Sequence, residues 1–422
     1  MQLNESNKAI RGALTAATCS LLGLPQAGVA ADNPWSVDTT ILYYQENDGR
    51  VQALEPVISA TRDMGGDRFF NTKLVVDVLT GASPNGAAPS DQVQTFTRPS
   101  GSGDYTTSAG NIPLDDTFRD TRGALSAGWQ QPISHDTRIN LGGNVSAEHD
   151  YASLGVNGAI ARDFNDKNTT LSAGLALSED VINPEGGIPT EFAAMVPAGD
   201  TLPRASSDDT KSLIDLLVGV TQVINRRTLM QFNYSMTQSD GYHTDPYKIL
   251  SVVDGVTGRP NQYVYEKRPD SRTRNSVFWQ TKYHLTRDVI DFSYRYFWDD
   301  WDISSHTVDL RYRWQFRDQH YLEPHVRYYQ QSAADFYRHS LVSGAALPDY
   351  ASADYRLAEF TGMTLGLKYG ITRHNDDELS MRFEVYQQPG ETHPSDAIGV
   401  QRDYNMYPDL TAYIVQFSYA FR

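Results

Sequence analysis

The chain has 422 residues and a formal net charge of −16, so the basic face that nucleic-acid binding requires is not expected. No stretch of the sequence approaches the roughly 18–20 uninterrupted apolar residues of a membrane helix. A transmembrane β-strand does not need such an apolar run, because lipid-facing and lumen-facing residues alternate along it. The 25 Tyr, 16 Phe and 6 Trp suit the aromatic belts of a membrane barrel, although a soluble all-β protein can share them.

Residues 1–30 have the pattern of a secretory signal peptide. Two basic residues precede a short apolar run, and small residues lead up to Ala30, after which we expect cleavage. Cys19, the only cysteine, lies in this segment. The expected mature chain, residues 31–422, therefore holds no thiol and no disulfide.

From residue 35 onward, apolar and polar residues alternate, which is typical of strands with two different faces. In the segments 290–298, 308–317 and 321–329, apolar residues occupy the even positions and polar residues most of the odd ones. Such segments run about 9–14 residues, which is long for soluble strands and right for a tilted membrane crossing. We predict an all-β fold: a transmembrane antiparallel β-barrel of about sixteen strands, with fourteen as the alternative.

Short polar turns alternate with long connections along the chain. The long connections are residues 81–118, 179–208, 241–268, 331–352 and 388–408. Short periplasmic turns and long extracellular loops are the asymmetry of outer-membrane barrels, whose even strand number leaves both termini in the periplasm. We expect one barrel domain over residues 31–422, without the separate plug domain of a TonB-dependent transporter.

The end of the chain carries an alternating, largely aromatic stripe, formed by Tyr413, Val415, Phe417, Tyr419 and Phe421. The stripe resembles the terminal signal that the outer-membrane assembly machinery recognises, so this machinery is an expected partner. The usual final aromatic residue is penultimate in this chain, and Arg422 follows it. Removal of the last five residues is expected to block assembly.

Four segments carry a family resemblance: Asp77–Gly86, Pro113–Arg122, Ser146–Ser153 and Asp245–Lys248. The first of them, Asp-Val-Leu-Thr-Gly-Ala-Ser-Pro-Asn-Gly, is the most specific. They resemble a family of uncharacterised bacterial outer-membrane proteins, defined by domain of unknown function 3570. The resemblance implies a β-barrel in the outer membrane of a Gram-negative bacterium. It brings no established activity.

If the apolar residues face lipid, the opposite set lines the lumen with charge. This predicted luminal set is Lys282, His284, Asp291, Arg295, Asp309, Arg311, Arg313, Glu323, His325, Arg327, Arg382 and Glu384. Opposite signs on neighbouring strands can satisfy one another across the wall. The set is either a charge-balanced lining or a pore wall whose basic side attracts anions.

Thr80, Gly81, Pro84 and Gly86 mark the place where a strand is expected to leave the barrel. Gly and Pro indicate turn chemistry at this place, and the ending of a phosphate-binding loop is missing. Loops as long as residues 81–118 are unusual unless they fold inward or bind something. We expect this loop to fold partly into or over the lumen.

Two further clusters of acidic residues suggest chemistry, one a hydrolase and the other a cation site. Residues 148–150, with Ser153, could suit a hydrolase, but adjacent residues of a strand point to opposite faces and no nucleophile elbow occurs. Residues 299–302 could hold a cation but lack the calcium-loop spacing, so a solvated acidic turn is favoured. The sequence indicates no metal centre and no cofactor.

These features favour a pore or conduit for small solutes or for export, with a charged lumen partly covered by the loop 81–118. The first alternative is a barrel scaffold that docks periplasmic or lipoprotein partners. An outer-membrane hydrolase is the second and less favoured alternative. Outer-membrane lipid and lipopolysaccharide surround the barrel in each case, and no nucleic acid is expected as a partner.

Overall fold

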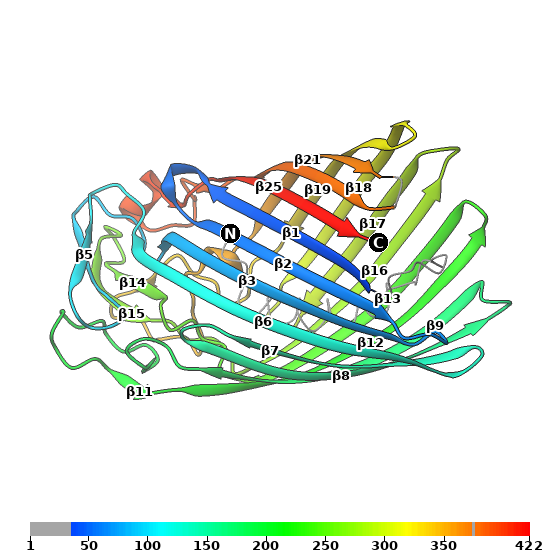
Figure 1. The fold of residues 1–422 in the computed structure, drawn as a ribbon. Helices are drawn as coiled ribbons and strands as arrows, with labels where there is room; N and C mark the ends of the chain where they lie inside the picture. Colours follow the sequence, from blue (N-terminus) through cyan, green and yellow to red (C-terminus); the bar gives the residue numbers. More distant parts are fainter. Residues whose placement is uncertain (1–34, 374–375) are drawn as a thin grey trace.

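The computed structural model describes residues 35–373 and 376–422, so the predicted signal peptide lies outside the described residues. Sixteen antiparallel strands close into a barrel, which confirms the predicted fold and strand number (Figure 1). In order around the barrel they are β1 (Trp35–Glu46), β2 (Gln52–Asp63), β3 (Phe69–Pro84), β6 (Leu114–Ser134), β7 (Thr137–Ala147), β8 (Tyr151–Phe164), β9 (Thr169–Ile182), β12 (Asp209–Asn225), β13 (Thr228–Gly241), β16 (Ser271–His284), β17 (Val289–Asp299), β18 (Ser304–Arg317), β19 (His320–Gln331), β21 (Phe360–Thr372), β22 (Glu378–Gln388) and β25 (Leu410–Phe421).

The last strand closes the barrel against the first. β25 pairs with β1 in an antiparallel register that runs from Val37 opposite Phe421 to Glu46 opposite Ala412. Closure satisfies every strand edge within the sheet, which a protein surrounded by lipid requires.

The outward face of the barrel is apolar. On β25, Tyr413 and Phe417 of the predicted stripe are 47% and 51% exposed, and on β21 Leu365 and Leu367 are exposed in the same way. Rows of large, exposed apolar side chains mark the face that meets lipid, so the residues between them line the interior. Among the described residues, no helix is both long enough and apolar enough to cross a membrane.

The two ends of the barrel differ. At one end, the turn end, short connections join the strands: 64–68, 135–136, 165–168, 226–227, 285–288, 318–319 and 373–377. At the other, the loop end, five long loops gather, at the left of Figure 1: 85–113, 183–208, 242–270, 332–359 and 389–409. Because β3 continues to Pro84 and β6 begins at Leu114, the loop that we predicted over 81–118 is shorter, at 85–113.

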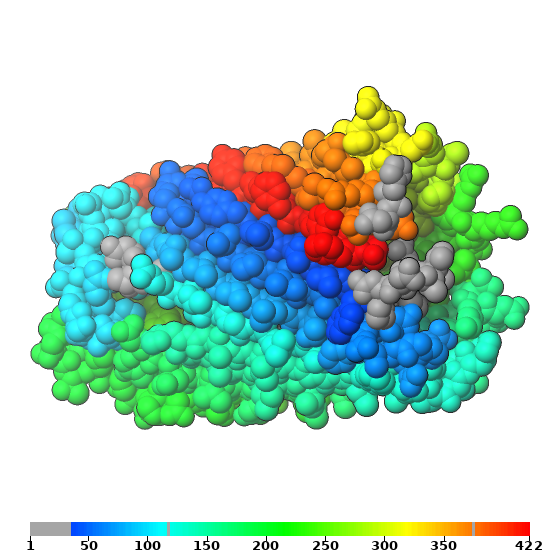
Figure 2. All heavy atoms as spheres, in the orientation of Figure 1, coloured from blue at the N-terminus to red at the C-terminus, as the bar shows by residue number. Residues whose placement is uncertain are grey.

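We call these five loops the cap, because they carry their own secondary structure. The elements are the pairs β4 (Gln94–Thr97) with β5 (Asp104–Thr107), β10 (Ile188–Pro189) with β11 (Arg204–Ser206), and β23 (Glu391–Thr392) with β24 (Asn405–Tyr407), then the three-stranded sheet of β14 (Ile249–Val253), β15 (Pro260–Tyr265) and β20 (Leu341–Val342). Short 3-10 helices lie at Tyr355–Leu357 and Gly399–Asp403 in the cap and at Asn47–Gly49 between β1 and β2. In the space-filling view, the atoms of loop 85–113 cover much of the loop end (Figure 2).

Candidate functional site

The loop 242–270, which we call the hub loop, crosses the mouth of the barrel. It leaves the barrel from β13, yet Lys248 Nζ donates to the carbonyl of Pro84 at the end of β3, six strands away around the barrel. Ile249 N also donates to Asn85 O at 2.9 Å. Strands six positions apart in a barrel of sixteen lie far across from each other, so these contacts form over the opening.

Three other cap loops bind the hub loop through their backbones. In the loop before β12, Met195 N donates to Tyr263 O at 2.9 Å. The strand β20, from the loop before β21, pairs in parallel with β14 of the hub loop. In the loop before β25, Val400 N donates to Thr257 O at 2.9 Å. The hub loop therefore holds the cap together.

Two of the apolar clusters in the cap include the hub loop. One consists of Ala87, Phe96, Ile249 and Tyr265. The other consists of Leu250, Val264, Leu341 and Ala351. Each joins the hub loop to another loop, and full burial of a large apolar side chain is worth about 1.5–3 kcal/mol. The cap is thus a packed body with cores of its own.

A buried ionic cluster ties the hub loop to the loop 332–359. Its three acidic members are Asp245, Glu266 and Asp354, and its basic members are Arg268, Arg356 and Lys248, the last of which acts on Asp245 without a direct ion pair. Arg268 Nη2 lies 2.9 Å from Asp354 Oδ2, and Arg356 Nη2 lies 2.7 Å from Asp245 Oδ2. Arg356 also pairs with Asp354. Because the charges balance, each ion compensates another that burial has removed from water.

The environment shifts the acid–base equilibria of this cluster. Burial opposes ionisation of Asp354, but Arg356 and Arg268 outweigh it and hold the pKa of that carboxyl well below its usual range. Burial raises the pKa of Glu266, and Arg268 offsets this only in part. Burial lowers the pKa of Lys248. The closed cap therefore depends on the ionised state of Asp354.

The motif from Thr80 to Gly86 is where the hub loop contacts the barrel wall. Thr80 and Gly81 lie within β3, and Pro84 ends it. Gly81 has φ +144°, and a Cβ there would lie 2.3 Å from the carbonyl oxygen of Arg50. Gly86 has φ +96°, and a Cβ there would lie 2.4 Å from the carbonyl oxygen of Ile249. Glycine is required at both positions because a neighbouring backbone approaches closely.

The predicted luminal set lies on the inward face of β16–β19 and β22, between the lipid-facing residues. His284 is exposed at the turn end, Arg295 lies over the Phe278 ring, and Arg327 is opposite Asp309 in the register. The ion pairs within the set are Lys282–Asp291 (3.5 Å), Arg311–Asp309 (3.4 Å), Arg382–Glu323 (3.7 Å) and Arg382–Glu384 (3.8 Å). The structure thus brings most of the set together as a ladder of paired charges.

His325 joins two carboxylates of this ladder. Its Nε2 lies 2.9 Å from Asp309 Oδ2 on β18, and its Nδ1 lies 2.8 Å from Glu384 Oε1 on β22. The second contact passes over β21 at Gly366, where a Cβ would lie 2.7 Å from Glu384 Cγ. The absence of a side chain at Gly366 leaves the space that this contact needs.

Alternation carried further along the chain would have found two more members of the ladder. Arg313 pairs with Glu378 at 3.6 Å, and Lys368 pairs with the same carboxylate at 3.2 Å. Tyr321 also donates to Glu378. Glu378 and Lys368 occupy the inward positions of β22 and β21. The ionic cluster of the cap had no comparable signal, because its residues lie in loops without periodicity.

The inward face is buried near the loop end and mixed near the turn end, where Tyr321 and Gln130 are buried but other side chains are exposed. On β16, Arg272 and Arg274 near the loop end are 9% and 7% exposed, whereas the side chain of Lys282 near the turn end is 50% exposed. On β3, Asp77 is buried and Asn71, nearer the turn end, is exposed. Among the described residues, the cap covers the loop end, and exposed inward side chains such as Lys282 occur near the turn end.

The acidic turn 299–302 is solvated only in part. Asp300 and Asp302 are exposed, as predicted for a solvated turn. The Asp299 side chain, in contrast, is fully buried and pairs with Arg272, whose guanidinium lies 4.2 Å from the centre of the buried Trp301 ring. Asp299 Oδ1 accepts the backbone N–H groups of Trp301 (3.1 Å) and Ile303 (2.9 Å). The carboxylate thus shapes the turn instead of facing water.

The histidine and acidic residues between β7 and β8 lie at the loop end. Asp150 Oδ2 accepts the hydroxyl of Tyr247, from the hub loop, at 2.6 Å. His149 is exposed, and Ser153 is buried on β8. Asp150 therefore serves to hold the hub loop against the barrel rim.

A comparison with known protein families identifies the family of this chain. The model of a family described as protein of unknown function (DUF3570) matches residues 11–421. The chain belongs to this family. The match covers almost the whole sequence and confirms the resemblance that four short segments carried. Among curated proteins, none matches the sequence.

Several solved structures are similar to the family member described above. A bacterial polysaccharide outer membrane secretin has 10% identity and a TM-score of 0.46, over 93% of this chain and 99% of that one. CdiB from Acinetobacter baumannii has 8% identity and a TM-score of 0.47, over 92% and 61%. A ferric enterobactin receptor from Pseudomonas aeruginosa has 7% identity and a TM-score of 0.45, over 92% and 60%. The chain therefore spans less than two thirds of the last two proteins.

Proposed function

We propose that this chain is a gated conduit for small solutes in the outer membrane of a Gram-negative bacterium. The cap carries the proposal, because the hub loop crosses the mouth at the loop end, while exposed charged side chains such as Lys282 line the inward face near the turn end. Barrels of about sixteen strands are wide enough to leave an aqueous channel. In this proposal, displacement of the hub loop opens the conduit.

The exposed part of the lumen favours small anions as solutes. The side chains of Arg311 and Arg313 are 38% and 35% exposed on the wall below the cap. Their carboxylate partners neutralise them only in part, since the contacts of 3.4 and 3.6 Å are looser than charge-assisted hydrogen bonds. Arginine lining is what anion and phosphate pores use.

The orientation follows from the two ends. Outer-membrane barrels turn their short connections to the periplasm, so we place the cap outside the cell and the open lumen toward the periplasm. Export through a cleaved signal peptide and insertion by the assembly machinery, which would read the stripe on β25, complete the proposal. Sequencing of the mature N-terminus tests export: a start near Ala31 supports it, and a start at Met1 contradicts it.

Conductance in planar bilayers tests the conduit. The refolded wild-type protein should show brief openings from a closed state. Replacement of residues 242–270 by Asn-Gly joins β13 and β16 as a hairpin and should give a larger, stable conductance, because it removes the segment that crosses the mouth. The matched variant replaces residues 85–113 by the same dipeptide. It keeps the hub loop and should raise conductance less.

The migration of heated and unheated samples in a denaturing gel shows whether each variant forms a closed barrel. A folded barrel without the hub loop that carries no current would overturn the conduit. That outcome would favour the alternative, a closed platform on which periplasmic or lipoprotein partners dock.

A further inference from the structure

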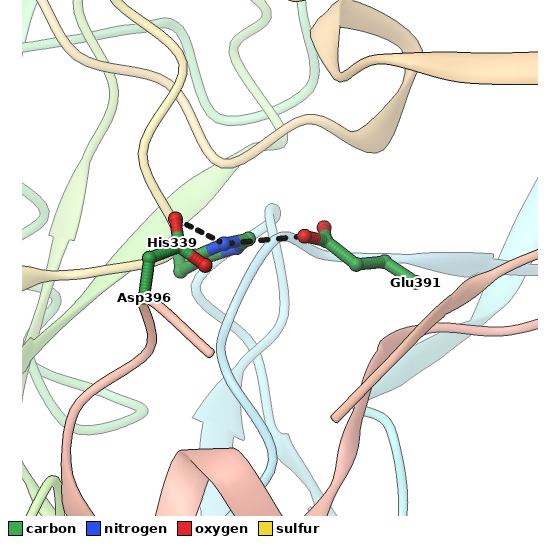
Figure 3. Close-up of side chains that lie close together, drawn as sticks. All are labelled: His339, Glu391 and Asp396. Carbon is green, nitrogen blue, oxygen red and sulfur yellow. Dashed lines mark ion pairs between the residues drawn. The ribbon is translucent and has the colours of Figure 1, made fainter. Parts of the chain in front are cut away.

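Three metal-ligating side chains from two cap loops converge at the loop end of the barrel (Figure 3). His339 comes from the loop before β21, while Glu391, at the start of β23, and Asp396 come from the loop before β25. His339 Nε2 lies 3.4 Å from Glu391 Oε1 and 3.6 Å from Asp396 Oδ2. The three ligand atoms lie within 4.8 Å of one another.

The two contacts of His339 fit ligands arranged around an ion. A hydrogen bond between an ionised carboxylate and a ring N–H is typically about 2.7–2.9 Å long. Ligand atoms about 2.0–2.2 Å from a tetrahedral metal ion are separated by about 3.3–3.6 Å. Both contacts of His339 fall in the second range. The side chains thus leave room for an ion between them.

The surrounding structure holds two of the ligands in place. The ring of His339 packs edge-on against Tyr337, with the ring centres 5.5 Å apart, and the Tyr337 hydroxyl is hydrogen-bonded to Glu391. The pairing of β23 with β24 fixes the backbone at Glu391. The side chain of His339 is 12% exposed and that of Asp396 is 75% exposed, so an ion could enter from the medium outside the cap.

The electrostatics of the cluster also favour a cation. The ligand oxygens of Glu391 and Asp396 lie within 4.8 Å of each other and of the imidazole nitrogen. Two carboxylates so close together repel each other when both are ionised. A divalent cation between them would remove this repulsion.

We propose that His339, Glu391 and Asp396 bind a divalent first-row transition-metal ion that cross-links the two loops. Imidazole distinguishes this class from Mg²⁺ and Ca²⁺, which prefer oxygen ligands, and the site offers no thiolate. One nitrogen and two carboxylate oxygens, with water in the fourth position, suit Zn²⁺. The ion pins the loop 389–409 to the loop 332–359, which carries part of the ionic cluster. Its effect on gating rests on the proposed function, whereas binding itself does not.

Calorimetric titration of Zn²⁺ into tag-free, refolded, full-length protein, first stripped with EDTA, tests the site. Wild type should bind one ion per chain at this site. Loss of an outer-shell partner alone costs about 10–100-fold in metal affinity, so His339→Gln and Asp396→Asn should each weaken binding by at least about tenfold. His149→Gln and Asp403→Asn remove an exposed histidine and an exposed carboxylate elsewhere at the loop end, and they should leave affinity unchanged.

Equal affinity in the wild type, the two ligand variants and the two controls would overturn the site. So would the absence of Zn²⁺ binding to the wild type. Bilayer recordings with Zn²⁺ or EDTA separate the two proposals. Binding that depends on His339, together with a barrel that never conducts, leaves the metal site standing and removes the conduit.

Discussion

The turn end and the loop end of this barrel are made by the same sixteen strands, yet among the described residues only the loop end carries loops that reach across its opening. At the turn end, connections such as 135–136 and 226–227 are too short to reach over the opening. At the loop end, the hub loop reaches from β13 to the end of β3 and binds other loops on its way. The length of the connections, and not the strands, therefore decides which end is covered.

The difference between the two ends shows how long loops can pack into a stable cap over the barrel. A loop ordered by itself would lose conformational entropy of about 1–2 kcal/mol per residue without compensation. The cap offsets that cost with two apolar clusters, a small sheet and a balanced ionic cluster. Removal of one central interaction should therefore make the loop end behave more like the turn end.

Asp354→Asn should have the largest effect among single substitutions. It keeps the size of the side chain but leaves Arg268 and Arg356 without their shared carboxylate. Loss of one partner of a buried ion pair costs about 3–5 kcal/mol, so the open fraction should rise more than about 100-fold. Single-channel recording measures this fraction directly.

Asp349→Asn is the matched control, because it changes an exposed carboxylate in the same loop. Its open fraction should equal that of the wild type. If the two variants behaved alike, the ionic cluster would not be what keeps the loop end closed.

Acid should change the open fraction of the cap in two opposite directions, depending on the pH. The pKa of Asp354 is depressed below its ordinary value of 3.8 in the closed cap, so the opened cap binds this proton more readily and acid below about pH 3.8 favours opening. The pKa of Glu266 is raised above 4.5 by burial, so mild acid protonates the closed cap first and favours closure. Open fraction against pH should therefore dip in mild acid and rise in stronger acid.

Glu266→Gln tests whether protonation of Glu266 causes the dip of the open fraction in mild acid. The variant should lose the dip in mild acid and keep the rise below about pH 3.8. A dip that persists in Glu266→Gln would show that another group titrates in this range.

Arg311→Glu should change the open end of the lumen and leave the closure alone. Measured in the variant without the hub loop, it should reduce the preference for Cl⁻ over K⁺. A unit charge at 4 Å in water is worth about 1 kcal/mol. The substitution changes the charge by two units, which sets an upper limit of about 2 kcal/mol, or about 30-fold, for each ion. The reversal potential in a KCl gradient gives the preference.

Arg226→Glu makes the same charge change in the turn between β12 and β13, outside the lumen. It should leave the reversal potential unchanged. Equal shifts in the two variants would mean that the predicted luminal wall does not set selectivity.

The sequence predicts the barrel well because alternation obeys a rule of period two. Once the even residues of segment 308–317 face lipid, Asp309 and Arg311 must face inward. Two termini on the periplasmic side require an even number of strands. The glycine-rich motif can also be recognised in the sequence. The sequence does not show why glycine is required, because the carbonyl groups of Arg50 and Ile249 approach Gly81 and Gly86 only in the folded chain.

The cap could not be predicted in the same way. Arg268 and Asp354 are 86 residues apart in sequence and lie in loops without periodicity. The buried state of Asp299 depends on Arg272 and Trp301, which a local pattern of acidic residues cannot indicate. Loop packing depends on which segments meet across the mouth, and that follows from strand order and not from local sequence.

Gly366→Ala should have the smallest effect, because it lies on the wall between the two ends and alters neither closure nor opening. The added Cβ would lie 2.7 Å from Glu384 Cγ, so Glu384 must shift away from His325. Overpacking of this kind costs about 1–3 kcal/mol and should lower the unfolding temperature by a few degrees.

Gly123→Ala on β6, whose Cβ would meet nothing within 4 Å, is the control and should unfold like the wild type. Equal unfolding temperatures for the two variants would mean that the bridge between His325 and Glu384 adds nothing to the stability of the wall.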